Sequence, residues 1–370
     1  MDVTRAQVVA HRVAAQGLLR DRPLDALLDL GVQDTGPSAR LALAARDARP
    51  VDTVTIDPAA HGLVDAWTHR GAPHHHRPGD LPALAASTCP RSDADAAARL
   101  AWSGPRQRAV GISAAEAIAR VADAVAEVVA EPLTKGAASA AITARLPDAL
   151  LTDCRPCGST HVGEQLLRLA ALPAGVTLDA TGTTLLLLPP PSGWSRPELP
   201  ADTRRLVAAH LRVLGPATPA DVAAFLGTTE RAWGGWSADD LAGGLAEVRV
   251  EGRPAWLPVD DVDALAHAPD PDAVRLLPPS DPLLAGRDRE TLVPDEAHRK
   301  ELYRAIGNPG AVLADGEIVG SWRPRSAGRR LTITVTAFTP LPSDVRARLD
   351  DEAERVAAAQ GRTLAALSVG

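Results

Sequence analysis

The sequence predicts an α+β protein in which tandem winged-helix modules precede a β-rich C-terminal part. Two observations lead to this fold class. The order helix, helix, hairpin occurs twice between residues 131 and 265, and a proline-rich stretch at 189–200 separates the two occurrences. Apolar residues alternate at period two over 331–337, as is typical of a strand with one buried face.

These patterns divide the 370 residues into four predicted modules. A chain of this length can bury several cores, and an aromatic content of 3% means that aliphatic side chains must fill them. We expect an N-terminal helical or winged-helix module at 1–130, a winged helix at 131–195, a second winged helix at 196–265 and a β-rich module at 266–370.

The N-terminal module contains a short polar connection between two predicted helices. Asp25 to Leu30 has helical period, and Gly36-Pro37 opens the next helix. Gln33, Asp34 and Thr35 lie between them. The N-cap of the second helix would be a sufficient role for Asp34 or Thr35, so this connection alone does not establish a functional site.

Three consecutive histidines, His74 to His76, follow a predicted strand end that includes Arg70. On a strand only His74 and His76 would share a face, whereas a zinc site needs three or four convergent ligands. We therefore expect no metal here. Arg70 and His74 are candidates for the rim of a nucleic-acid site, and a plain surface histidine run is the alternative.

The predicted winged helix at 131–195 has helices at Gly136–Arg145 and Gly163–Leu172 and a hairpin at Gly175–Leu188. The preceding segment, Ser113 to Val129, has the pattern of a long amphipathic helix.

The same module contains a possible metal or redox motif. Cys154 and Cys157 are spaced as in a zinc knuckle, with His161 as a third ligand, but no second CxxC or histidine pair follows at the usual spacing. No βαβ pattern of the thioredoxin type surrounds the cysteine pair either. We expect a metal-free loop and no cofactor.

The second winged helix is predicted from helices at Asp202–Leu214, Pro219–Leu226 and Glu230–Leu245 and a hairpin at Val248–Leu257. A DNA-reading helix needs Arg, Lys, Asn or Gln along one face, whereas the third helix offers Arg231 among acidic residues. We expect this module to be architectural.

The C-terminal module is predicted to present a basic hairpin. Asp315-Gly316 is a strong hairpin turn, and a second Pro/Gly-containing turn follows Trp322. Arginines crowd this second turn, which suits a DNA groove, although a solvated turn is the alternative. The chain is expected to end in an amphipathic helix capped by Ser343. The hairpin arginines are Arg323, Arg325, Arg329 and Arg330.

Three separated stretches together resemble the AlkZ/AlkX-like family of winged-helix DNA glycosylases. They are Leu28–Ala45, Ala66–His74 and Leu276–Arg289. Gln33 matches the first catalytic position of that family, and the second falls on Thr35, where the family has Gln or Asp. The resemblance extends over nearly the whole chain.

The resemblance implies hydrolysis of the N-glycosidic bond of bulky N-alkylated purines or of crosslinks. Gln33 would hold the attacking water, and Asp34 could stabilise positive charge on the sugar. Because Thr35 departs from the pattern, a non-catalytic DNA-binding protein that has lost the second catalytic residue remains the alternative. In the third stretch, Arg287 and Arg289 are candidates for phosphate contacts, or members of an internal Asp–Arg network.

Charge and composition restrict the partners and the compartment. A net charge of −7 argues against avid, non-specific coating of DNA but allows a local basic surface. An odd number of cysteines argues against a disulfide scaffold, and no hydrophobic signal region or membrane-length apolar run occurs. We expect a cytoplasmic monomer whose partner is double-stranded DNA.

Overall fold

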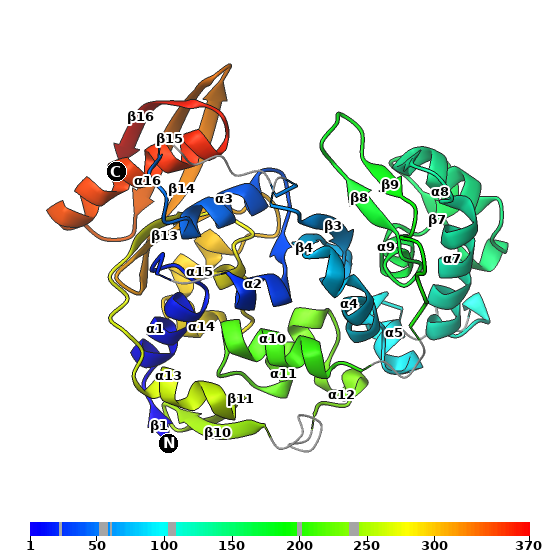
Figure 1. Ribbon diagram of the computed structural model, residues 1–370, viewed down its shortest axis with the longest axis horizontal. Helices are drawn as coiled ribbons and strands as arrows, with labels where there is room; N and C mark the ends of the chain where they lie inside the picture. Colours follow the sequence, from blue (N-terminus) through cyan, green and yellow to red (C-terminus); the bar gives the residue numbers. More distant parts are fainter. Residues whose placement is uncertain (22–23, 52–57, 60, 103–108, 198–201, 237–243) are drawn as a thin grey trace. The chain divides into compact units, whose positions relative to one another are not determined.

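The computed structural model describes residues 1–370 apart from 22–23, 52–57, 60, 103–108, 198–201 and 237–243 (Figure 1). The chain forms two compact units that are not continuous in sequence. Unit 1 comprises Met1–His61, Ala208–Thr218 and Leu241–Gly370, and unit 2 comprises Gly62–Val207 and Pro219–Asp240. The α+β fold class is confirmed, whereas the boundaries of the four predicted modules remain a prediction.

Unit 1 is built on a five-stranded sheet of order β12-β13-β14-β15-β16. Neighbouring strands are antiparallel except for the parallel pair of β15 and β16. Helix α16 (Ser343–Ala359) packs against β12 and β16, and Figure 1 shows it beside β16. The strands are β12 (Val274–Leu277), β13 (Gly310–Ala314), β14 (Glu317–Ala327), β15 (Arg330–Ala337) and β16 (Thr363–Val369).

The expectation that the chain ends in a helix is wrong, because β16 follows α16. The N-cap of α16 is Pro342, with Ser343 as the first helical residue. A strand such as β16, which joins the sheet in parallel after a helical crossover, lacks the short-range turn signal that identifies a hairpin.

The N-terminal helices of unit 1 share a core with elements from the C-terminal third of the chain. Val9 and Val13 pack in one apolar cluster with Leu283 and Leu313. The helices of this part are α1 (Arg5–Ala15), α2 (Asp25–Leu30), α3 (Ser38–Arg46), α14 (Arg289–Leu292) and α15 (Glu296–Leu302), and a two-residue strand β2 (Val32–Gln33) lies between α2 and α3.

A second, three-stranded sheet in unit 1 has the order β1-β10-β11. The N-terminal strand β1 (Asp2–Val3) pairs in parallel with β10 (Leu245–Val250), which forms a hairpin with β11 (Arg253–Pro258). Helix α13 (Val262–Ala266) completes a small core through Leu265. The predicted hairpin at 248–257 therefore exists, and it begins three residues earlier than expected.

Unit 2 contains the helix–helix–hairpin order expected between residues 131 and 195. The helices enclose a core in which Ile118, Ile142, Leu167 and Leu187 are buried. The elements are α7 (Ala114–Val128), β5 (Leu133–Thr134), α8 (Lys135–Thr143), β6 (Leu151–Cys154), β7 (Ser159–Val162), α9 (Glu164–Ala171), β8 (Thr177–Asp179) and β9 (Leu186–Leu188). The β6–β7 hairpin, which was not predicted, is inserted between α8 and α9.

The rest of unit 2 consists of a hairpin and short helices. Strand β3 pairs with β4 and, at Asp65, with β8. The elements are β3 (Val64–Trp67), β4 (Pro73–His76), α4 (Leu81–Thr88), α5 (Asp93–Arg99), α11 (Pro219–Leu226) and α12 (Glu230–Trp233). Helix α10 (Arg204–Leu214) belongs to unit 2 up to Val207 and to unit 1 from Ala208 on.

The helix predicted for Glu230–Leu245 is shorter than expected. Gly234 adopts a left-handed conformation, with φ of 89°, and ends α12 after one turn. Residues 237–243 of that prediction, and residues 198–200 of the predicted proline-rich linker, lie outside the described residues.

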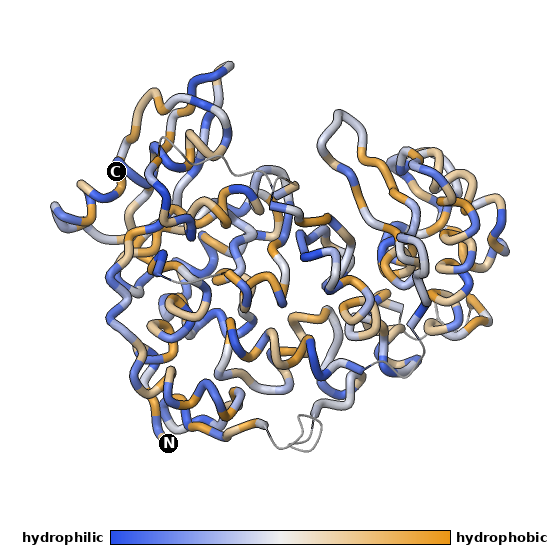
Figure 2. Tube along the Cα trace, viewed as in Figure 1, coloured by the Kyte–Doolittle hydropathy of each residue, from blue (hydrophilic) through white to orange (hydrophobic). Residues whose placement is uncertain are grey.

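Hydrophobic and polar residues are mixed along the elements of both units (Figure 2). Within the described ranges, no helix is long and apolar enough to cross a membrane.

Candidate functional site

The connection between α2 and α3 holds Gln33, Asp34 and Thr35 in unit 1. It begins at Gly31, whose φ of 89° turns the chain sharply out of α2. The side-chain carboxamide nitrogen of Gln33, Nε2, donates a hydrogen bond to the Thr35 hydroxyl at 3.1 Å. The Gln33 side chain is half-buried and Thr35 is exposed, so the carboxamide is held at a surface that a substrate could approach.

Asp34 lies beside the start of α3. Its carboxylate accepts a hydrogen bond from the Ala39 amide at 3.4 Å, a long and therefore weak bond. The Thr35 carbonyl accepts a shorter bond, 2.9 Å, from the Ser38 hydroxyl. The N-cap position of α3 is Pro37, which makes no side-chain capping bond, so Asp34 contacts the first turn of α3 without being its N-cap residue. Asp34 directly follows Gln33 in the chain.

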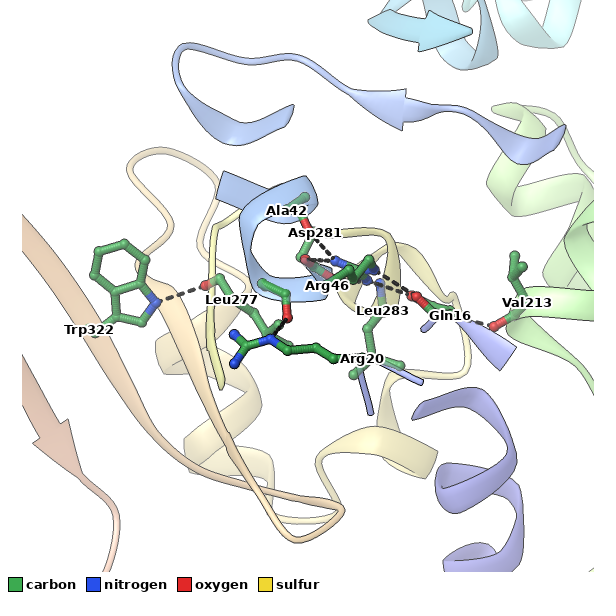
Figure 3. A network of polar contacts seen from close by, with 10 residues as sticks. Gln16, Arg20, Ala42, Arg46, Val213, Leu277, Asp281, Leu283 and Trp322 are labelled. Carbon is green, nitrogen blue, oxygen red and sulfur yellow. Dashed lines mark hydrogen bonds and ion pairs between the residues drawn. The ribbon is translucent and has the colours of Figure 1, made fainter. Parts of the chain in front are cut away.

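A buried ion pair fixes the other end of α3. Arg46 and Asp281 form a bidentate salt bridge with N–O distances of 2.8 and 2.9 Å, and both side chains are 0% exposed. Arg46 also donates to both the carbonyl and the side chain of Gln16, which in turn donates to the Val213 carbonyl (Figure 3). This network fixes α3, and with it one end of the polar connection.

The two acidic residues of the Leu276–Arg289 stretch form ion pairs inside unit 1. Asp281 belongs to the buried network, and Asp288 pairs with Arg12 at 2.7 Å. Arg12 also donates to the Gly215 and Pro216 carbonyls. Both acidic residues of the stretch therefore brace unit 1, through arginines that lie outside the stretch.

Arg287 and Arg289, the two arginines of the same stretch, are not part of these ion pairs. Within the described part of the chain neither forms an ion pair with a carboxylate, and both are half-buried. Burial and the nearby charge of Arg289 lower the pKa of Arg287 from its ordinary value. The Arg289 guanidinium lies 4.2 Å from the ring centre of Tyr303, whose pKa burial raises to about 12. This arrangement concentrates positive charge that an anion could neutralise.

In unit 2, three histidine rings lie together under the β3–β4 turn. His69, His74 and His76 are all buried, and the ring centres of His69 and His74 are 5.0 Å apart. The Thr68 hydroxyl is 2.9 Å from Nδ1 of His74 and 3.4 Å from Nε2 of His76. Burial, followed by the charges of His69, His76 and Arg70, holds the pKa of His74 well below its ordinary value.

The expectation for His74 needs correction. Its side chain is 3% exposed, so it cannot contact a phosphate directly. The alternation argument placed His74 and His76 on one face, and both are indeed buried there. The sequence could not show that this face is turned inward, because alternation identifies two faces without saying which is covered.

Arg70 lies at the β3–β4 turn, in a left-handed conformation with φ of 58°. Its guanidinium donates to the Phe225 carbonyl and lies 5.1 Å from the centre of the Phe225 ring. Its own carbonyl accepts from Gln165 of α9 at 3.2 Å. Arg70 is half-buried and is engaged within unit 2.

The β14–β15 hairpin presents exposed arginines on one face. Arg323 and Arg325 are two residues apart and pair with Thr334 and Thr332 across the ladder, so their side chains share a face. Residues 321–336 contain no acidic side chain, and the tip is hydrophilic (Figure 2). All four predicted arginines, Arg323, Arg325, Arg329 and Arg330, are exposed.

Trp322 directly precedes Arg323 in the chain, but its side chain is on the other face of the hairpin. It is 2% exposed on the opposite face, where its indole N–H donates to the Leu277 carbonyl at 2.8 Å (Figure 3). The exposed face instead carries hydroxyl groups, including Thr334 and Ser368 of β16. The alternating threonines of β15 were visible in the sequence, whereas the contribution of β16 depended on a pairing that the sequence did not reveal.

One further group brings together side chains of the types that bind metals. The ligand atoms of Cys154, Cys157 and His161 lie within 4.8 Å of one another at the β6–β7 hairpin of unit 2. Across the described residues this is the one cluster of three or more such groups.

Similarity to known proteins shows the family to which the chain belongs. The family model "DNA glycosylase AlkZ-like" matches residues 27–359. An interstrand DNA cross-link repair glycosylase from Streptomyces sahachiroi is 30% identical over 183 residues, which are 45% of this chain and 46% of that protein. The chain thus matches about half the length of this relative. The solved structure of Streptomyces sahachiroi DNA glycosylase AlkZ superimposes with a TM-score of 0.74 over 100% of both chains, at 24% identity.

Proposed function

Because the chain belongs to the family of AlkZ-like DNA glycosylases, we propose that it hydrolyses the N-glycosidic bond of bulky N-alkylated purines in double-stranded DNA. One observation carries the proposal beyond the family assignment. The α2–α3 connection presents a carboxamide, Gln33, next to a carboxylate, Asp34, and the buried Arg46–Asp281 pair anchors the helix that follows them.

For this hydrolysis the protein must mainly position a water molecule and stabilise positive charge on the sugar. An N-alkylated purine carries positive charge and leaves as a neutral base, taking the electrons of the glycosidic bond with it. Gln33 can accept a hydrogen bond from a water molecule and orient its oxygen toward the sugar carbon. Asp34 can stabilise the cationic sugar and take the proton that the water loses, and its 3.4 Å bond to the Ala39 amide is weak.

The same proposal assigns the DNA-binding surfaces. In unit 1, the exposed arginines of the β14–β15 hairpin are candidates for phosphate contacts, and so are Arg287 and Arg289, which form no ion pair among the residues that the structure describes. In unit 2, Arg70 is the candidate. These groups are local concentrations of positive charge on a chain whose net charge is −7, so affinity should depend on them rather than on the whole surface. We propose that one copy of the chain acts alone.

The alternative is a DNA-binding protein without catalysis. The contact of Asp34 with the Ala39 amide favours it, because a carboxylate that only caps α3 leaves no base beside Gln33. Thr35, at the second family position, cannot replace that base, since a hydroxyl stays protonated at neutral pH.

The test is incubation of the protein with duplex DNA that carries 7-methylguanine at one position, followed by alkaline cleavage at abasic sites. We expect strand cleavage at that position and free 7-methylguanine in solution. Binding to the duplex without any release of base, from 7-methylguanine and from bulkier N7 adducts alike, would support the non-catalytic alternative.

Interstrand crosslinks are a separate part of the proposal, supported by the name of the Streptomyces relative. In a crosslink that joins two purines through their N7 atoms, each purine has the same weakened N-glycosidic bond as in a single N7 adduct. We expect the protein to separate such crosslinked strands. Activity on single adducts with none on crosslinks would restrict the proposal to the former.

A further inference from the structure

The β6–β7 hairpin of unit 2 brings three metal-binding side chains together. Cys154 is the last residue of β6 and pairs with Ser159, while His161 pairs with Thr152. Cys154 and His161 are therefore diagonal neighbours on one face of the ladder. Asp153 and Thr160 occupy the other face, where the Thr160 hydroxyl donates to the Asp153 carboxylate at 2.6 Å.

The turn brings the second cysteine to the same place. Cys157 lies in the four-residue connection, followed by Gly158 with φ of +62°, a conformation that favours glycine. The Gly158 amide donates to the Arg155 carbonyl at 3.3 Å, which closes the turn. As a result the two sulfur atoms and an imidazole nitrogen lie within 4.8 Å of one another.

The imidazole is also oriented for coordination. Nδ1 of His161 lies 2.7 Å from the Val162 carbonyl oxygen, to which it donates a hydrogen bond. With its proton on Nδ1, the ring leaves the lone pair of Nε2 available as a ligand. A backbone carbonyl that fixes the tautomer in this way is a usual partner of metal-binding histidines.

We propose that Cys154, Cys157 and His161 bind one Zn²⁺ ion. Two thiolates and one neutral imidazole form a soft donor set that suits this metal. Cys157 is exposed, so a water molecule can fill the fourth position. Glu164 is unsuited to that position because Lys135 and Arg168 already hold its carboxylate, at 2.7 and 2.6 Å. This proposal reverses the expectation of a metal-free loop and is independent of the glycosylase activity.

The ion would act as a structural clamp. The hairpin leads directly into α9, and the Val162 amide donates to the Thr143 hydroxyl of α8 at 3.0 Å. From α9, Gln165 and Arg168 donate to the carbonyls of Arg70 and Gly71 at the β3–β4 turn, each at 3.2 Å. A metal at the hairpin would therefore stabilise the start of the helix that supports this turn.

The test is the zinc content of the full-length protein, purified without chelators and without a histidine tag. We expect about one equivalent in the wild type and less than about a tenth of an equivalent in Cys154→Ser, Cys157→Ser and His161→Ala. Cys89→Ser is the matched control, because Cys89 is a buried cysteine of the same unit outside the cluster, and it should retain the metal. Wild-type levels of zinc in the double variant Cys154→Ser/Cys157→Ser would overturn the proposal.

A second measurement covers the case in which these variants fold poorly. Wild-type protein stripped of metal is titrated with Co²⁺, and we expect a thiolate-to-cobalt charge-transfer band that saturates at about one equivalent and disappears when Zn²⁺ is added. No band, together with no zinc retained after equilibration and gel filtration, would overturn the proposal. A wild-type mass lower by two hydrogen atoms under non-reducing conditions would also do so, because it would assign the cysteines to a disulfide.

Discussion

At the scale of single residues, the central question is whether Asp34 is a catalytic carboxylate or a helix cap. The hydrogen bond that it accepts from the Ala39 amide has a length of 3.4 Å and is compatible with either role. Asparagine can accept the same bond and caps helices about as well as aspartate, but it carries no charge. Substitution of Asp34 by Asn therefore separates the two roles.

We predict that Asp34→Asn lowers the single-turnover rate of 7-alkylpurine excision by about 10- to 10³-fold, with a change of less than about 0.5 kcal/mol in the free energy of unfolding. The loss follows from removing the charge that stabilises the cationic sugar. Asp344→Asn, which removes an exposed carboxylate from the first turn of α16, is the control, and its rate should match that of the wild type. Equal rates for Asp34→Asn and wild type would assign Asp34 to capping alone.

The buried histidines of unit 2 predict a second effect at this scale. His74 is neutral at pH 7, because burial and the charges of His69, His76 and Arg70 depress its pKa. The unfolded chain, with an ordinary histidine pKa of about 6.5, then binds a proton more readily than the folded protein does. The free energy of unfolding should therefore fall as the pH drops below about 6.5, by up to about 1.4 kcal/mol per pH unit from this group.

Urea denaturation between pH 7 and 5 measures this effect. His74→Gln should have a shallower pH dependence than the wild type. This window lies above the range in which ordinary carboxylates titrate, so their contribution is small. Identical slopes for wild type and His74→Gln would show that His74 does not titrate differently in the folded protein.

At the scale of elements, the β14–β15 hairpin is a positively charged strand pair held by a buried tryptophan. Trp322 anchors one face through the Leu277 carbonyl, and the arginines with the neighbouring threonines form the other. Because phosphate contacts release counterions, the contribution of this face should be visible in the dependence of affinity on salt.

We predict that the triple variant Arg325→Ala/Arg329→Ala/Arg330→Ala binds duplex DNA more weakly and lowers the slope of log affinity against log salt by about 2–3, since each neutralised phosphate contributes about 0.9. Sequence preference should not change. The matched control replaces Arg120, Arg145 and Arg204, three exposed arginines that are paired with carboxylates. If both triple variants have the same slope, phosphate contacts should instead be sought at Arg70, Arg287 and Arg289.

At the scale of the whole molecule, the sequence predicted the elements better than their assembly. The hairpins at 248–257 and around Asp315-Gly316 were visible because strand alternation and turn residues are local signals. The parallel pairings of β1 with β10 and of β16 with β15 join residues far apart in the chain, and no local pattern reports them. The two units are likewise assembled from separate segments, which composition along the chain does not reveal.

The candidate site was predicted in the same uneven way. The positions of Gln33, Asp34 and Thr35 on a connection between helices followed from helix period and the Gly-Pro start signal. The Arg46–Asp281 pair that supports them joins residues 235 positions apart, so it could not be derived from spacing. His74 was misplaced for a related reason: strand alternation identified its face correctly, but which face is buried is decided by tertiary packing.

The measurement that tests the central claim most directly is single-turnover release of free base from duplex DNA containing 7-methylguanine, with excess wild-type or Gln33→Ala protein. If Gln33 orients the attacking water, wild type releases the base and Gln33→Ala does so at least about 10²-fold more slowly, while both bind the duplex and unfold alike. Equal rates in the two proteins would contradict the assignment of Gln33. Wild-type protein that binds the duplex and releases no base would contradict the glycosylase account itself.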